Sequence, residues 1–219
     1  MIKIGDVKKS EEIKTYIRRA DESLGQLGYT EHAFAHVNKC SQVAGSLLQK
    51  LGYDDRTVEL GEIAAYLHDI GNVVNRTDHA QSGAIMAFRL LEKMGMPPDE
   101  VATIVAAIGN HDESTGFPVS APAAALILAD KSDVRRSRVR NREQSAFDIH
   151  DRVNFAVEHG ALSLDAEAKT LALELGIDNE ICAVMDYFEI FLGRMIMCRK
   201  AAEKLGLEFK LIINEQQLI

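Results

Sequence analysis

Over the first 136 residues, apolar positions recur with the period of amphipathic helices, and polar positions fill the other faces. Glycine and proline divide this pattern into segments, because both residues interrupt regular helices. The segments predicted to be helical are residues 11–27, 31–51, 55–70, 79–94, 101–110 and 123–136. The connections between them are as short as those that ordinarily join helices in bundles. The pattern therefore predicts a bundle of roughly six helices.

One of these helices ends on an adjacent histidine and aspartate, within residues 60–72. Its apolar residues recur at helical spacing and predict a core-facing stripe of Ile63, Ala64, Leu67 and Ile70. His68 and Asp69 follow on the last turn, and we expect Gly71 to end the helix in the left-handed conformation that other residues avoid. Taken alone, such a pair is more often a buried histidine beside a solvated acid. Whether His68 and Asp69 are structural or bind a metal depends on which other ligand-type residues the chain supplies.

After Asn141 the pattern changes to short alternating segments of the kind found in strands. Strands are predicted over residues 153–157, 169–175 and 209–214, and a long helix over residues 179–205. His159, beside Gly160, is expected in a hairpin turn between two strands. The fold class is therefore predicted to be mainly α: a helical domain at residues 1–140, followed by a small α+β unit at residues 141–219.

Composition and charge narrow the classes of function. The chain has 219 residues, of which 47% are hydrophobic and 26% charged, as in an ordinary globular protein. The net charge of −8 predicts neither general nucleic-acid binding nor attachment to a membrane surface. The N-terminus lacks the apolar core of a signal peptide. The three cysteines, without CxxC spacing, suit reduced thiols, so a cytoplasmic location is expected.

Metal-ligand residue types gather at helix ends and on apolar helix faces before residue 131. These candidates are His36, His68, Asp69, His79, His111 and Asp130. Asp130 lies in an apolar run, where an acid is seldom buried without a charge partner. Each residue alone is more often structural. Together they offer four imidazoles and two carboxylates from five helices, which the core of a bundle can gather into one metal site.

The order of these residues resembles that of a known family. His36, then His68-Asp69, then Asp130, spread over about ninety-five residues, is similar to the HD-domain metal-dependent phosphohydrolases. The resemblance covers residues 30–140, and none is found after Asn141. It implies an HD-domain-like helical bundle. His79 and His111 match the further histidines of family branches that bind two metal ions.

One branch of the family, the HD-GYP cyclic-dinucleotide phosphodiesterases, is distantly similar around residues 110–118. Two residues depart from its pattern. Asn72 stands where that branch usually carries a lysine, and Asn110 replaces the first of its paired histidines. The resemblance is therefore to the superfamily as a whole.

The resemblance also implies a ligand set and a reaction. One ion would be held by His36, His68, Asp69 and Asp130. A second ion would be held by His79 and His111, with Asp69 bridging the two. Divalent iron or manganese is favoured, and zinc or cobalt is compatible with the same ligands. The implied activity is hydrolysis of a nucleotide or another small phosphoester by a metal-activated hydroxide, with His68 and Asp69 at the catalytic centre.

A basic run follows Asp130, and it has two interpretations. Its members are Lys131, Arg135, Arg136, Arg138, Arg140 and Arg142. Cations are favoured near a helix C-terminus, so the run could be a solvated helix end. Guanidinium groups also pair with phosphate oxygens, so it could bind substrate. If it does, Lys131 and Arg135 are the expected contacts, and the residues from Arg138 onward are expected on the surface.

Four other residues near this set receive structural interpretations. His32, one turn before His36, and His150-Asp151, which repeats the dipeptide, are both interpreted as structural. Asp133 is expected to orient Lys131 or an arginine.

Two further functions compete with the enzyme. In one, the helical site binds metal or nucleotide without turnover, and the C-terminal unit carries an effector contact or a homodimer contact. In the other, the histidines merely fill a metal-free core. The partner expected for the enzyme is a small, nucleotide-like phosphorylated substrate.

Overall fold

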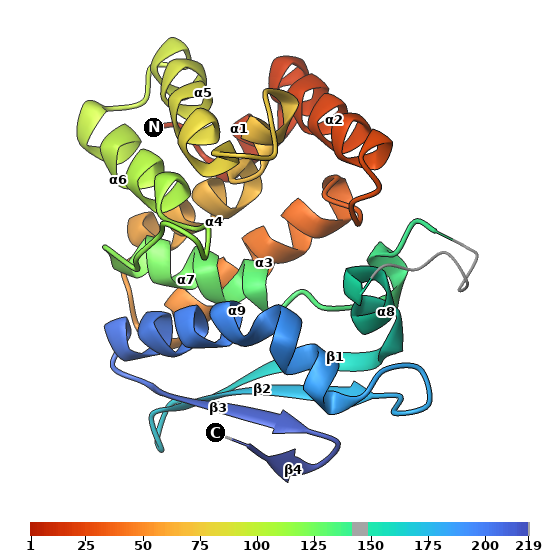
Figure 1. Cartoon of the computed structure of the whole chain (residues 1–219). Helices are drawn as coiled ribbons and strands as arrows, with labels where there is room; N and C mark the ends of the chain where they lie inside the picture. The colour runs from red at the N-terminus through yellow and green to blue at the C-terminus, as the bar shows by residue number, and fades with distance from the viewer. Residues whose placement is uncertain (142–148, 219) are drawn as a thin grey trace.

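The computed structural model describes residues 1–141 and 149–218, and its N-terminal part is a bundle of α-helices (Figure 1). The helices are α1 (Ile4–Lys9), α2 (Glu11–Gln26), α3 (Phe34–Lys50), α4 (Asp55–Leu67), α5 (His79–Lys93), α6 (Pro98–Gly109) and α7 (Ala121–Lys131). Short 3₁₀ helices follow α4 and α7: η1 (Ile70–Val73) and η2 (Arg136–Arg138). Among these helices of the N-terminal part, α1 was not predicted.

The C-terminal part combines helices with a small sheet. Its elements are α8 (Ile149–Ala156), β1 (Val157–Asp165), β2 (Thr170–Ile177), α9 (Val184–Lys204), β3 (Glu208–Ile213) and β4 (Gln216–Gln217). The strand order is β1-β2-β3-β4, and only β2 and β3 are parallel. Their connection is α9, which lies between α7 and the sheet (Figure 1). The predicted fold class, mainly α with a small C-terminal α+β part, is confirmed.

The central helix of the molecule is α7. Every residue from Pro122 to Ala129 is buried, which agrees with a helix that is apolar on all sides. The helix is covered by α3, α4, α6 and α9, so the bundle and the C-terminal part share one continuous apolar core. Asp130 and Lys131, at the end of α7, are thereby carried to the middle of the molecule. The predicted division at residue 140 stays a prediction.

Two predicted elements differ in the structure. The helix predicted to reach residue 136 ends at Lys131, and the basic run continues as an extended segment and η2. The strand predicted at residues 153–157 is the end of α8, because apolar residues three and four apart also fit a helix in so short a segment. Strand β1 begins at Val157, so His159 pairs with Gly176 inside the sheet instead of lying in a turn.

The role predicted for Gly71 is wrong, although a glycine is required there. Gly71 lies in η1 and does not adopt the left-handed conformation. Instead, α5 packs directly against it: an added Cβ would lie 2.0 Å from the His79 carbonyl oxygen and 2.4 Å from the Gly83 nitrogen. This close approach places the start of α5 beside Asp69.

None of the described helices is both long and apolar enough to cross a membrane.

Candidate metal centre

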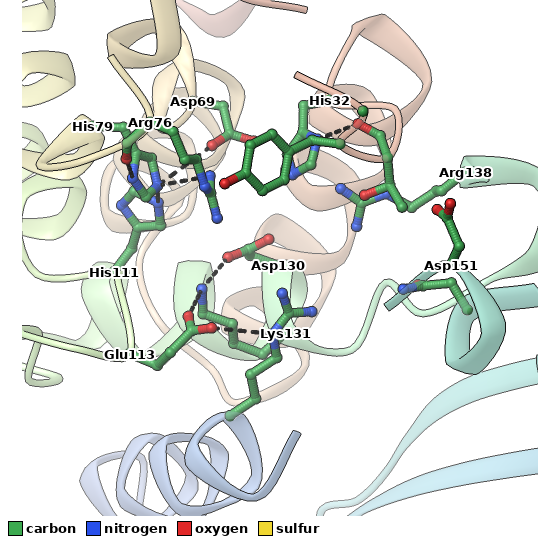
Figure 2. Close-up of a pocket in the computed structure, with 15 residues that line it drawn as sticks. His32, Asp69, Arg76, His79, His111, Glu113, Asp130, Lys131, Arg138 and Asp151 are labelled. Carbon is green, nitrogen blue, oxygen red and sulfur yellow. Dashed lines mark hydrogen bonds and ion pairs between the residues drawn. The ribbon is translucent and has the colours of Figure 1, made fainter. Parts of the chain in front are cut away.

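The six predicted ligand residues converge at one point of the bundle. They are His36 on α3, His68 and Asp69 after α4, His79 at the start of α5, His111 after α6 and Asp130 on α7. Five of them are buried, and Asp130 is nearly so. Figure 2 shows four of the six on the wall of the same cavity. The distances from His36 Nε2 to His68 Nε2 and to Asp130 Oδ1 are both 3.3 Å.

The four imidazoles share one orientation. Each donates its Nδ1–H to an oxygen that can only accept. The donations run from His36 to Asp133 (2.8 Å), from His68 to the Ala65 carbonyl (2.8 Å), from His79 to the Arg76 carbonyl (3.0 Å) and from His111 to the Ile108 carbonyl (2.6 Å). In the neutral ring, every Nε2 therefore presents its lone pair to the centre, as metal-bound histidines do. The facing Nε2 atoms of His79 and His111 are only 3.1 Å apart, so their lone pairs repel unless a cation lies near them.

The carboxylates also fit a metal. Asp69 Oδ2 is buried and has no hydrogen-bond partner among the described residues, although His68 Nε2 lies 3.0 Å away. Burial alone would raise the pKa of Asp69, but the nearby imidazoles, His68 first, hold this pKa well below its usual value. The pKa of Asp130 is likewise held low, by Lys131 and His36, against the effect of burial. Both residues are therefore in the anionic form that binds metal.

The pKa shifts of the imidazoles also fit a metal site. Burial, with help from neighbouring cations, lowers the pKa of His111 to about 3, so its ring stays neutral. For His68, burial would lower the pKa, but the Asp69 and Asp130 carboxylates raise it above the usual value. The cluster thus attracts positive charge to the place where the lone pairs meet. The residues present fit a divalent metal ion.

Two overlapping groups have the spacing of metal ligands. His36, His68 and Asp130 form one, and His68, Asp69 and His111 form the other; within each group the ligand atoms lie within 4.8 Å of one another. Asp69 also faces both halves of the cluster, since its Oδ1 is 3.7 Å from His79 Nε2. The predicted division of the ligands between two ions, with Asp69 as the bridge, stays a prediction.

Of the two predicted substrate contacts, only Lys131 lines the cavity. Its ammonium is buried, 2.6 Å from Glu113 and 2.8 Å from Asp130. Arg135 does not line the cavity, because the chain leaves the helix at Lys131. Its guanidinium instead binds the Asp133 carboxylate, at 2.8 Å and 3.2 Å.

The prediction for the rest of the basic run is correct for one arginine and wrong for another. Arg138 was expected on the surface, but it is buried, lines the cavity and donates to the Glu31 carbonyl at 2.9 Å. Arg140 lies on the surface as predicted and pairs with Asp21. Arg142 lies outside the described residues. Asp133, expected to orient a cation of the run, also accepts the Nδ1–H of His36.

Several cavity residues were missed or set aside. His32 and Asp151, interpreted as structural, both line the cavity. The other residues that the sequence did not single out for this site are Gly28, Tyr29, Thr30, Arg76, Glu113, Asn154 and Arg194. Arg194 comes from α9 and is held by Glu113 at 3.2 Å. Spacing along the chain offers no signal for a residue brought in by the fold, whereas the repeated His-Asp dipeptide was a signal for Asp151.

Comparison with known proteins identifies the class. The family model of the HD domain matches residues 33–155, more than half of the chain. The chain therefore belongs to the HD-domain family, and the prediction made from the order of histidines and aspartates is confirmed.

The relatives are distant. The chain is 23% identical over 195 residues to the uncharacterized protein MJ1020 of Methanocaldococcus jannaschii, a match that covers 78% of this chain and 74% of the relative. It is 29% identical over 176 residues to ribonuclease Y of Cutibacterium acnes, covering 77% of this chain but only 30% of that protein. A crystal structure of a predicted HD superfamily hydrolase from an uncultured Thermotogales bacterium is 28% identical and covers 57% of this chain and 67% of its own, with a TM-score of 0.45.

Proposed function

We propose that this protein is a metal-dependent phosphohydrolase that acts on a nucleotide or another small phosphoester. The observation that carries the proposal is the convergence of four Nε2 lone pairs and two anionic carboxylates beside a cavity whose wall also carries basic side chains. His36, His68, Asp69 and Asp130 would hold one ion, and His79 and His111, with Asp69, a second. A divalent metal held there supplies Lewis acidity, which makes hydroxide available near neutral pH and offsets charge on phosphoryl oxygens.

The side chains of the cavity provide the rest of the site. Lys131 places a buried ammonium next to Asp130, where it can bind a phosphoryl oxygen. Arg138 and Arg194 also line the cavity and add positive charge to it.

A small substrate is favoured over a polymer. Ribonuclease Y is by name an enzyme of RNA, and phosphodiester hydrolysis would suit the centre described here. The net charge of −8 nevertheless disfavours long-range attraction of an RNA strand. The basic side chains lie inside the cavity, where they can reach a single phosphate group.

The test begins with metal. Protein purified without chelator should contain one to two equivalents of transition metal, and Asp69→Ala should lose most of it. Asp55→Ala, which removes an exposed carboxylate from α4, is the matched control and should keep its metal. Near-full metal content in Asp69→Ala would contradict the assignment.

Activity is tested next, on phosphomonoesters, nucleotides and cyclic dinucleotides. Lys131→Gln should retain its metal and lose about ten- to a hundredfold in kcat/KM, the effect of removing a charge-assisted hydrogen bond to phosphate. Metal binding without turnover of any of these substrates would favour the regulatory module over the enzyme.

A further inference from the structure

Among the described residues, Arg76 is the one cation of the cavity wall with no carboxylate partner. The ammonium of Lys131 touches two carboxylates, and the Arg194 guanidinium touches Glu113. Arg138 lies 3.8 Å from the carboxylate of Asp133. A guanidinium that lines a cavity without a protein anion is suited to the anion of a ligand.

Three neighbours position the Arg76 side chain. Its Nη1 donates to the Asn72 side-chain oxygen at 3.3 Å and lies 3.4 Å from His79 Nε2. Its guanidinium carbon lies 5.7 Å from the centre of the Tyr29 ring, within the range of a cation–π contact. The amide of Asn72 also donates to the Asp69 carboxylate at 2.9 Å, so it connects Arg76 to the metal-ligand cluster.

We propose that Arg76 forms an oxyanion-binding site at the edge of the candidate metal centre, and that its ligand is a phosphate group or the phosphoryl group of a phosphoester. Asn72 and Tyr29 act as positioning residues. The site rests on the proposed function only for the identity of the anion, since any tetrahedral oxyanion presents the same oxygen atoms to the guanidinium.

Arg76 also competes with metal for His79. In the structure its Nη1 faces the lone pair of His79 Nε2, which the second ion would use. Removal of the guanidinium should therefore weaken anion binding without weakening metal binding. If Arg76 had only a structural role, its removal would weaken both anion binding and metal binding.

The experiment uses Mn²⁺ as the metal and inorganic phosphate as the anion, each titrated calorimetrically into the 219-residue chain. In Arg76→Gln, the Kd for phosphate in the Mn²⁺-loaded protein should rise about ten- to a hundredfold. The Kd for Mn²⁺ should stay the same or fall. Arg76→Lys should recover part of the phosphate affinity, because it keeps the charge but not the forked donors.

The matched control is Arg89→Gln, which removes the same charge from the exposed face of α5, outside the cavity wall. It should leave phosphate binding unchanged. The proposal is overturned if Mn²⁺-loaded wild type does not bind phosphate, if Arg76→Gln binds it as well as wild type, or if both variants lose affinity equally. The titration measures phosphate binding and does not depend on hydrolysis. Absence of hydrolysis would therefore count against the proposed function and not against this site.

A second observation, independent of the first, concerns the outer face of α9. Met185, Leu192 and Ile196 are 73%, 51% and 39% exposed, and helical spacing places them on one side of the helix. The exposed ring of Phe117 lies beside the same helix, 5.8 Å from Lys200 Nζ. The solvated face of a helix is normally polar, and an exposed apolar patch marks an interaction surface.

The charges around this apolar patch indicate what covers it. Glu189 lies on the N-terminal side of Leu192, and Arg199 lies on the C-terminal side of Ile196. If two copies of α9 cross antiparallel about a two-fold axis midway between Leu192 and Ile196, each Leu192 meets the Ile196 of the other copy. The same axis places Glu189 beside the Arg199 of the other copy. Gly193, which is exposed and has no atoms near its missing Cβ, leaves room for the approaching helix.

We infer that α9 is a self-association surface whose occupant is a second copy of this chain, related by a two-fold axis. Sedimentation velocity over the micromolar range should show a dimer of the wild type. Leu192→Asp should be monomeric. Ile85→Asp, a control at an exposed apolar residue of α5, should remain dimeric.

Charge exchange tests the antiparallel arrangement. Glu189→Arg and Arg199→Glu should each weaken the dimer, because each places like charges together across the axis. The double variant should restore it. A monomeric wild type, a dimeric Leu192→Asp or a double variant weaker than both single variants would overturn the inference.

Discussion

At the scale of single residues, the orientation of the four candidate ligand imidazoles depends on what their Nδ1 atoms bind. Asp133 is the one side chain among these acceptors, and it holds His36 at 2.8 Å. Burial alone would raise the pKa of Asp133, but hydrogen bonds from His36 and Arg135 outweigh it and hold the pKa well below the usual value. Arg135 therefore serves the site through Asp133 rather than through a substrate.

This role predicts the effect of Asp133→Asn. The variant keeps the shape of the side chain but removes the charge that orients His36 and makes its Nε2 more basic. Loss of such an acceptor typically weakens metal binding about ten- to a hundredfold. A metal titration compared with Asp55→Asn, on the surface of α4, measures the effect. Equal affinities in the two variants would show that the carboxylate does not support the centre.

His111 predicts a pH dependence of stability. Its pKa is lowered to about 3 by burial, and by nearby cations, from the value near 6.5 of an unfolded chain. Between these pH values the unfolded chain binds a proton that the native protein does not, so stability rises with pH. The contribution of His111 is present above about pH 6.5 and is lost as the pH falls toward 3.

The comparison is between metal-free wild type and His111→Gln. Between about pH 6 and pH 4, the free energy of unfolding of the wild type should fall faster, by about 1.4 kcal/mol per pH unit. Urea unfolding of chelator-treated protein at several pH values measures both slopes. Parallel slopes would mean that His111 titrates normally in the folded protein.

At the scale of elements, the contact between η1 and α5 brings the two halves of the ligand cluster together. Gly71→Ala would press a methyl group against the His79 carbonyl, so α5 must move away and carry His79 from Asp69. Overpacking of this kind costs about 3 kcal/mol. We expect a lower free energy of unfolding and loss of the second metal equivalent.

Gly109→Ala is the control for this prediction. Its Cβ would meet only the Ala84 Cβ, at an ordinary 3.7 Å, across the packing of α5 on α6. It should keep its metal and its stability, as measured by metal analysis and urea unfolding. Two metal equivalents in a stable Gly71→Ala variant would show that α5 has freedom to shift.

At the scale of the whole molecule, the C-terminal part completes the core that holds the site. Helix α7 is apolar on all sides, and α9 covers one of them. A fragment of residues 1–140 would expose that side of α7 and would lack Arg194. We expect the fragment to aggregate or to lose a cooperative thermal transition, followed by circular dichroism and size-exclusion chromatography. A monomeric fragment with a sharp transition would instead support an independent domain ending at residue 140.

The sequence by itself determined most helices of the bundle and indicated the candidate ligand residues. Periodic apolar residues specify amphipathic helices locally, and α2, α5 and α6 begin and end within a few residues of the predicted positions. Histidine and aspartate residues at helix ends were recognisable because their order is similar to that of a known family. These features depend on neighbours along the chain, or on a pattern read directly from it.

The tertiary structure alone decided which basic residues reach the site. Lys131 does, but Arg135 does not, since the end of α7 turns the run away from a helical path. Arg76 and Arg194 do, because η1, α5 and α9 pack around the same cavity from distant parts of the sequence. The physical reason is that packing of whole elements places such residues, and helical spacing extends only over the few residues of one turn.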